Sequence, residues 1–241
     1  MSLGLRLLAR LSDQLLTPDA LLSSTADWLR HRYREMRPKC RIGEVDSFLT
    51  LFCQLHPAAE DLELSLVGAG QLVASANTTT VGPGYHVFVS TLLKELAQEI
   101  GASWQKPVTD SGEFEDETGY FFTNDEEHLK AEMSRWLAAL ANVVRDETID
   151  RQSWPMALCL PIDTQFEAES PAITPLGPRD REWLARTRRN GDDGTDFFAW
   201  WESGFTAEYY LRRALTQMWA NVRWRPSIND SERLALEDVA C

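Results

Sequence analysis

The 241-residue sequence lacks several features that would assign it to a class. It has no apolar run approaching the roughly 20 residues that a membrane-spanning helix needs. The N-terminal stretch MSLGLRLLARLSDQLL lacks both the apolar core and the small-residue cleavage site of a signal peptide. Its cysteines (Cys40, Cys53, Cys159 and Cys241) form no CxxC pair and have no histidine at ligand spacing. We therefore expect reduced thiols in a cytoplasmic protein, without a zinc site or a disulfide framework.

Catalytic and cofactor-binding signatures are also missing. The sequence contains no GxSxG elbow, no HExxH pair and no kinase or deaminase motif. Gly68-Ala69-Gly70 follows an apolar stretch as in a dinucleotide fingerprint, but the next residues, QLVASANTTT, are typical of a strand and not of a helix start. We expect no cofactor and no metal.

One glycine-rich turn, GPGYH at residues 82–86, precedes an apolar helical pattern and could suggest a phosphate cradle. Pro83 has no backbone N–H to offer an anion, and the first lysine after the turn is Lys94, more than two helical turns on, so a P-loop is excluded. Tyr85 and His86, at the start of this helix, allow two interpretations. In one they line a cleft, where His86 could act as a general base if a carboxylate oriented it. In the other they pack at a strand-to-helix corner.

The net charge of the chain is negative, and the charged residues are unevenly distributed along it. The chain has a formal net charge of −13, yet its first 42 residues hold eight Lys and Arg against four Asp and Glu. The remaining residues therefore carry a balance of −17. Such a surface repels nucleic acid and anionic lipid and attracts a cationic partner. The alternative interpretation is that the acidity only keeps the protein soluble.

Residues 110–132 concentrate this charge, with nine acidic residues and one lysine. The segment lacks the alternating ligands of an EF-hand, so it predicts no calcium site. Aromatic residues lie among the carboxylates, and aromatic anchors ringed by acids suit an interface with a basic protein. The alternative is a solvated loop and helix start. The predicted partner-binding residues are Glu113, Phe114, Glu115, Asp116, Glu117, Tyr120, Asp125, Glu126 and Glu127.

Periodicity predicts an α+β fold, with a small, mainly antiparallel sheet packed with six to eight helices. We expect one domain over 1–241, in which 1–42 is a basic helical segment, 62–165 a sheet-containing core and 179–241 an aromatic-rich helical part. Helices are predicted over 5–16, 18–36, 85–100 and 125–145, and a short one in VDSFLTLFCQL at 45–55. Residues 62–81 predict a hairpin, and GYFFT at 119–123 predicts a short strand.

In this character, acidic and aromatic-rich with no catalytic motif, the chain resembles the immunity proteins of bacterial polymorphic and type VI toxin systems. The resemblance covers the whole chain but rests on no alignable signature, so it transfers no functional residue. It implies a protein that binds and neutralises a cognate toxin, with a basic surface, by occluding its active site. It implies no binding to nucleic acid or membrane.

Two other functions remain open at this point. One is an enzyme whose site is assembled in space around Tyr85, His86 and nearby carboxylates. The other is an adaptor or scaffold subunit that docks through Trp- and Tyr-rich helices within 197–224, where Trp200, Trp201 and Trp219 lie.

Overall fold

The computed structural model describes residues 3–12, 17–68, 70–106, 115–145, 156–157, 170–222 and 226–240. Its fold is α+β, as predicted. Contacts group the chain into two compact units, Met1–Thr79 with His86–Glu126 and Thr80–Tyr85 with Glu127–Cys241. The assignment of 1–241 to a single domain stays a prediction.

The first unit is built on a six-stranded antiparallel sheet with the strand order β2-β3-β4-β5-β1-β6. Its strands are β1 (Gly4–Leu11), β2 (Lys39–Val45), β3 (Phe48–Gln54), β4 (Leu62–Val67), β5 (Gln71–Asn77) and β6 (Ala102–Trp104). Its helices are α1 (Pro18–Arg32), the 3₁₀ turn η1 (Arg34–Met36), α2 (Pro83–Glu99), whose first turn contains the unit boundary, and α3 (Tyr120–Thr123).

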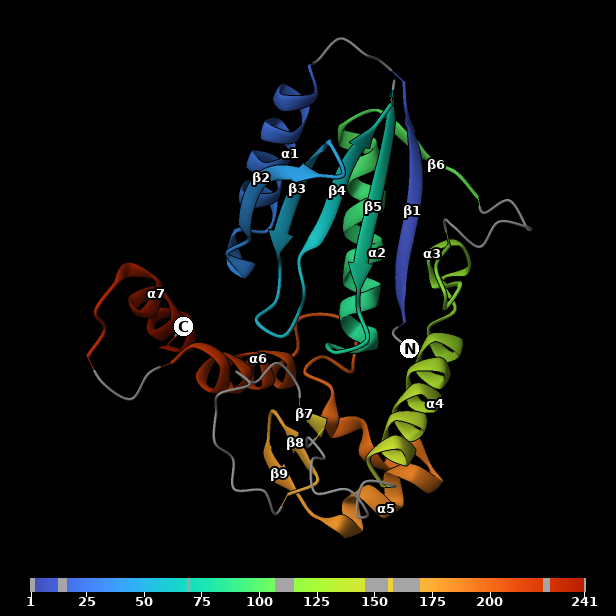
Figure 1. The fold of residues 1–241 in the computed structure, drawn as a ribbon, viewed down its shortest axis with the longest axis vertical. Coiled ribbons are helices and arrows are strands. Elements are labelled where there is room, and N and C mark those ends of the chain that lie inside the picture. Colours follow the sequence, from blue (N-terminus) through green and yellow to red (C-terminus); the bar gives the residue numbers. More distant parts are fainter. Residues whose placement is uncertain are drawn as a thin grey trace. The chain divides into compact units, whose positions relative to one another are not determined.

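One face of this sheet forms the core of the first unit. The register aligns Leu51, Leu64, Ala74 and Leu7 in a row across β3, β4, β5 and β1, and all four are buried. Figure 1 shows α1 and α2 on the same side of the sheet. The buried side chains of these helices include Leu22, Ala26 and Leu29 from α1 and Val89, Leu92, Leu93 and Leu96 from α2. Burying these apolar surfaces removes them from water, which is the main stabilising contribution to the unit.

The first predicted helix, 5–16, is wrong, because the sequence GLRLLARL forms strand β1 instead. Leu5, Leu7 and Ala9 are buried in alternation, whereas Arg6 and Arg10 are exposed, which is the period of a strand. β1 pairs with β5 on one side and with β6 on the other. Pairing on both sides satisfies its backbone groups, so tertiary contacts override a pattern that fits a helix equally well.

The short helix predicted at 45–55 is also wrong, because these residues form most of the β2–β3 hairpin. The two-residue turn consists of Asp46 and Ser47, both with positive φ (49° and 69°). Positive φ at both central residues is the geometry that matches the twist of a hairpin. GYFFT is likewise not a strand. Its last four residues form α3, flanked by Gly119 and Asn124 in left-handed conformations.

Other predictions are confirmed. The hairpin predicted at 62–81 is β4–β5, and the helices predicted over 85–100 and 125–145 are α2 and α4 (Glu126–Arg145). The sheet nevertheless extends outside the predicted core range of 62–165, since β1, β2 and β3 all precede it. Among the described residues of the predicted basic helical segment 1–42 (3–12 and 17–42), α1 and η1 are the helical elements.

The second unit holds most of α4 and a small sheet with the order β7-β8-β9. Its remaining elements are β7 (Met156–Ala157), β8 (Ala172–Thr174), β9 (Gly177–Arg179), α5 (Arg181–Arg189), the 3₁₀ helix η3 (Gly191–Phe197), α6 (Ala207–Asn221) and α7 (Asp230–Ala240). Its core contains Phe197, Phe198 and Trp200, which are at most 3 % exposed. No helix among the described residues is both long enough and apolar enough to cross a membrane.

Candidate functional site

The GPGYH turn places two buried residues in the first turn of α2. Gly82 has a φ of 115°, which favours glycine, and Pro83 opens the helix with a preset φ. The Gly84 N–H donates to the carbonyl of Trp200, 3.1 Å away. Tyr85 and His86 are both 0 % exposed, so neither faces an open cleft.

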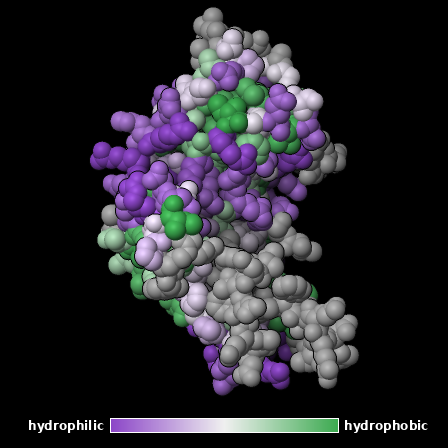
Figure 2. Space-filling model, turned by 60° about the vertical axis from the view of Figure 1, so that its left-hand side comes forward, coloured by the Kyte–Doolittle hydropathy of each residue, from purple (hydrophilic) through white to green (hydrophobic). Residues whose placement is uncertain are grey.

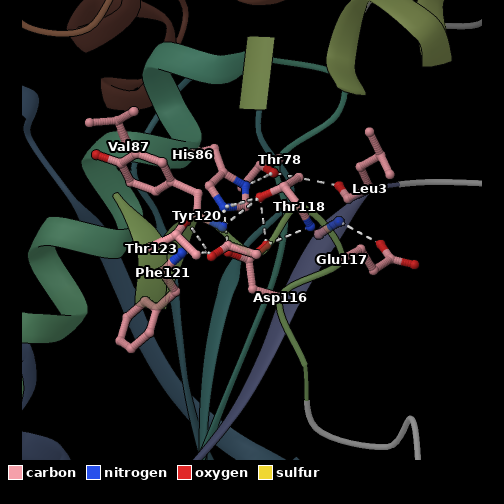
Figure 3. Close-up of polar contacts among 12 residues, drawn as sticks. Leu3, Thr78, His86, Val87, Asp116, Glu117, Thr118, Tyr120, Phe121 and Thr123 are labelled. Carbon is pink, nitrogen blue, oxygen red and sulfur yellow. Dashed lines mark hydrogen bonds and ion pairs between the residues drawn. The ribbon is translucent and has the colours of Figure 1, made fainter. Parts of the chain in front are cut away.

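His86 lies at the centre of a buried polar network (Figure 3). Its Nδ1 is 2.8 Å from the hydroxyl of Thr78, at the end of β5. Its Nε2 is 3.3 Å from Asp116 Oδ2 and 3.2 Å from the Thr118 hydroxyl. The Tyr120 ring packs against the imidazole in a T-shaped arrangement with centroids 5.9 Å apart. Both ring nitrogens therefore have polar partners inside the protein.

Asp116 accepts hydrogen bonds at both carboxylate oxygens. Its Oδ1 accepts from the Thr118 N–H at 2.9 Å and the Thr118 hydroxyl at 2.7 Å. Its Oδ2 accepts from the Phe121 N–H at 2.6 Å and lies near His86 Nε2. Burial alone would raise the pKa of this carboxyl, but the interactions with His86, Phe121 and Thr118 outweigh burial and lower the pKa below its ordinary value. Asp116 is therefore an ionised carboxylate that accepts a hydrogen bond from the Nε2–H of His86.

The network anchors the chain on either side of Asp116 to β1. The Arg6 N–H donates to the Glu115 carbonyl at 2.8 Å, and the Glu117 N–H donates to the Gly4 carbonyl at 3.2 Å. The Glu117 carboxylate in turn accepts from the Gly4 N–H at 2.7 Å. Residues 115–117 thus lie along β1 as a short antiparallel partner. The described part of the acidic segment is held by backbone hydrogen bonds and by the buried hydrogen bonds of the Asp116 carboxylate.

The predicted partner-binding residues divide into three groups. Glu115, Glu117, Asp125 and Glu127 are exposed, and Glu126 is half-buried. Asp116 and Tyr120 are buried, so the structure does not place them on an accessible surface. Glu113 and Phe114 lie outside the described residues. Part of the predicted set therefore lies on the protein surface, whereas Asp116 and Tyr120 lie in the interior.

The carboxylate that orients His86 escaped the sequence analysis. Asp116 is 30 residues from His86, and nothing in a run of acidic residues marks the one that is buried. A strand is marked in a sequence by alternating apolar and polar residues, but Glu115, Asp116 and Glu117 are all acidic, so no such signal is present.

The arrangement combines an imidazole, a carboxylate and two hydroxyls, which are the groups used in proton transfer. His86 and the Asp116 side chain are 0 % and 1 % exposed, so a substrate has no access to them. No group of three or more His, Cys, Asp or Glu residues in the described part of the chain could hold a metal ion. The burial of both side chains suits the network to fixing the structure of this segment.

An open surface pocket of about 520 Å³ lies elsewhere in the first unit, lined by Trp28, Arg32, Glu95, Gln98 and Glu99. The Glu95 carboxylate accepts from the Arg32 guanidinium at 3.0 and 3.2 Å and from the Tyr33 hydroxyl at 3.0 Å. The Arg32 and Glu95 charges at this pocket thus satisfy each other.

Comparison of the chain with protein-family models, curated proteins and solved structures found no match.

Proposed function

We propose that this chain is an acidic, cytoplasmic protein-binding module, and specifically an immunity protein that neutralises a cognate bacterial toxin with a basic surface. One observation carries the proposal. Glu115 and Glu117 are exposed on a segment whose central residue, Asp116, is buried and hydrogen-bonded at both oxygens. The carboxylates are therefore presented from a fixed backbone.

A fixed backbone favours binding. Ordering a mobile loop at an interface costs free energy that would reduce the affinity, and a preorganised segment avoids much of that cost. Asp125 follows α3, which the Asp116–Phe121 hydrogen bond connects to the same network. The exposed carboxylates of Glu115, Glu117 and Asp125 thus share one anchor. They would cover the basic residues that line the toxin's active-site entrance.

The net charge of −13 supports the same function. Long-range attraction between an acidic module and a basic toxin speeds their encounter, and added salt screens this attraction. We therefore expect fast association that slows as ionic strength rises.

The experiment begins with affinity capture of the full chain from its native host and identification of the bound proteins. Each bound protein is then expressed alone and together with the chain in a heterologous bacterium. We expect one of them to arrest growth when expressed alone and to lose its toxicity on co-expression. A set of bound proteins in which none is toxic would overturn the immunity function.

Charge reversal tests the surface. The variant Glu115→Lys with Asp125→Lys should weaken binding to the captured toxin and reduce the salt dependence of association. The matched control, Glu44→Lys with Glu60→Lys, makes the same change in net charge at exposed sites on the same unit. If both variants bind equally well, the acidic segment is not the interface.

A second candidate, an adaptor that docks through its C-terminal helices, is favoured by one observation. Phe205, Tyr210 and Leu211 are 48–55 % exposed, and the rings of Phe205 and Tyr210 lie 6.5 Å apart. Grouped apolar side chains of this kind suit a docking surface. Phe205→Glu with Tyr210→Glu should abolish capture of the bound proteins if the adaptor function holds, and should leave it unchanged for an immunity protein.

A further inference from the structure

Two cysteines face each other across the β2–β3 hairpin. Cys40 and Cys53 are direct partners in the antiparallel register. In a hairpin with a two-residue turn, the pair flanking the turn, Val45 and Phe48, is hydrogen-bonded, and the pairs alternate from there. Counting back along the register makes Cys40 and Cys53 a pair without mutual backbone hydrogen bonds. Such pairs have Cα atoms only about 4.5 Å apart, and their side chains approach closely.

A side-chain contact supports this assignment independently. In such a pair the backbone carbonyl points away from the partner strand. The Cys40 carbonyl accepts a hydrogen bond from Arg30 Nη2 of α1, 3.0 Å away, which places that carbonyl on the outer edge of β2. The Cys40 and Cys53 side chains meet each other instead, with sulfur atoms 2.8 Å apart. The Cα–Cα distance of about 4.5 Å expected for such a pair lies within the range of about 4.4–6.8 Å that a disulfide spans without moving the backbone.

The two thiols differ in access and in acidity. Cys40 is half-buried on the edge strand, whereas Cys53 is 0 % exposed. The hydrogen bond donated by Cys53 lowers the pKa of the Cys40 thiol, burial opposes this, and the positive charge of Arg30 lowers the pKa further. The carboxylates of Asp61 and Asp27 act in the opposite direction. The same hydrogen bond and burial raise the pKa of Cys53, so Cys40 is the sulfur that ionises.

From this geometry we propose that Cys40 and Cys53 form a reversible peroxide-sensitive thiol pair, in which Cys40 reacts first and Cys53 resolves it into a cross-strand disulfide. The inference is independent of the function proposed above. The required oxidant is a hydroperoxide, with hydrogen peroxide as the simplest example.

The chemistry balances in two steps. The Cys40 thiolate attacks one peroxide oxygen, the O–O bond breaks, and hydroxide leaves and takes up a proton to form water. The product is a Cys40 sulfenic acid. The sulfur of Cys53 then attacks the Cys40 sulfur, the S–O bond breaks, and hydroxide leaves with the Cys53 proton as a second water. Two thiols lose two electrons, and one peroxide is reduced. A dithiol reductant reverses the change.

The disulfide would link the edge strand β2 covalently to β3. Among the strands that the structure describes, β2 is the outermost of its sheet, with β3 as its neighbour. Ile42, Val45 and Phe48 are 37–40 % exposed on this hairpin. Figure 2, which turns this side of the molecule forward, shows separate green groups among purple residues. An edge strand that frays exposes its unpaired backbone groups, and a covalent link to β3 would hold it in place.

The test uses the full chain, treated with hydrogen peroxide, alkylated under denaturing conditions and digested for mass spectrometry. We expect a linked peptide pair containing Cys40 and Cys53 that a dithiol reductant releases. Hydrogen exchange of residues 39–45 should be slower in the oxidised protein. Cys159→Ser with Cys241→Ser removes the other thiols and should leave the result unchanged. No Cys40–Cys53 peptide at peroxide levels that oxidise the other cysteines would overturn the proposal.

Substitutions separate the roles of the two sulfurs. Cys53→Ala, which keeps the buried position apolar, should trap a Cys40 sulfenic acid that dimedone labels, and Cys40→Ser should leave Cys53 unreactive. Arg30→Gln should slow the reaction several-fold near neutral pH, whereas Asp27→Asn should not slow it. Dimedone labelling at position 53 in the Cys40→Ser variant would show that the assigned order is wrong.

Discussion

Removing the Asp116 carboxylate should destabilise the first unit more than any surface change. In Asp116→Ala, the N–H groups of Thr118 and Phe121 and the Nε2 of His86 lose their acceptor in a site that water does not reach. An unsatisfied buried donor costs about 1–3 kcal/mol, and Asp116→Ala leaves three of them. We expect the free energy of unfolding to fall by about 3–5 kcal/mol, a large share of the roughly 5–15 kcal/mol of a typical domain.

Asp116→Asn should cost less, about 1–3 kcal/mol. The amide oxygen of Asn can still accept hydrogen bonds from the donors at one of the two oxygen positions. Its NH₂ group, at the other position, faces N–H donors that then have no acceptor. The order of stability, wild type above Asn above Ala, therefore follows from the number of acceptors that remain.

The same carboxylate should make stability depend on pH in acid. The pKa of Asp116 in the folded chain lies below its ordinary value of 3.8, so the unfolded chain binds a proton first as pH falls. Its contribution to stability is fully present above about pH 4 and is lost as pH falls through the folded pKa. In Asp116→Asn that contribution is absent, and the stability curve should be flatter below about pH 4.

The assay is urea unfolding monitored by circular dichroism, with hydrogen exchange of residues 4–11 to locate the loss in β1. Glu115→Gln, at the exposed neighbouring position, is the control and should change stability by no more than about 0.5 kcal/mol. If Asp116→Ala unfolds at the same urea concentration as the control, the reasoning about the network is wrong.

Three further substitutions in the second unit can be tested by urea unfolding. Gly84→Ala would place a Cβ 2.4 Å from the Trp200 ring and should cost about 1–3 kcal/mol by overpacking. Arg212→Leu would remove the donor that lies 2.7 Å from the Phe198 carbonyl, and we expect a loss of about 1–3 kcal/mol because that oxygen is buried. Asp180→Ala would remove the N-cap of α5 and should cost about 1 kcal/mol.

Each of these substitutions has a matched control. In Gly43→Ala the nearest neighbour of the added Cβ is the Phe52 ring at 3.3 Å, so this variant should be milder than Gly84→Ala. Asp193→Ala removes an exposed carboxylate for which the structure gives no capping role, and it should change stability little beside Asp180→Ala. For Arg212, a Lys variant that retained full stability would contradict a requirement for the planar guanidinium.

The errors in the predicted fold have a common cause. Leu5, Leu7 and Leu8 with Leu11 fit a helix as well as a strand, and only pairing with β5 and β6 selects the strand. The turn at Asp46 and Ser47 lacks the glycine that usually marks a hairpin, so β2 and β3 were not recognised. Long periodic helices such as α2 and α4 were predicted correctly because their buried faces repeat over many turns.

Local pattern and charge were enough to establish the α+β class, the helix after GPGYH, the β4–β5 hairpin and the acidic character of residues 110–132. These features depend on neighbours in the chain or on composition, which a sequence displays directly. Tertiary structure alone decided that Asp116 is buried against His86, that residues 115–117 pair with β1, and that Cys40 faces Cys53. Each of these contacts either joins residues that are far apart in the chain or depends on the strand register. Long-range contacts and strand register are not determined until the sheet has formed.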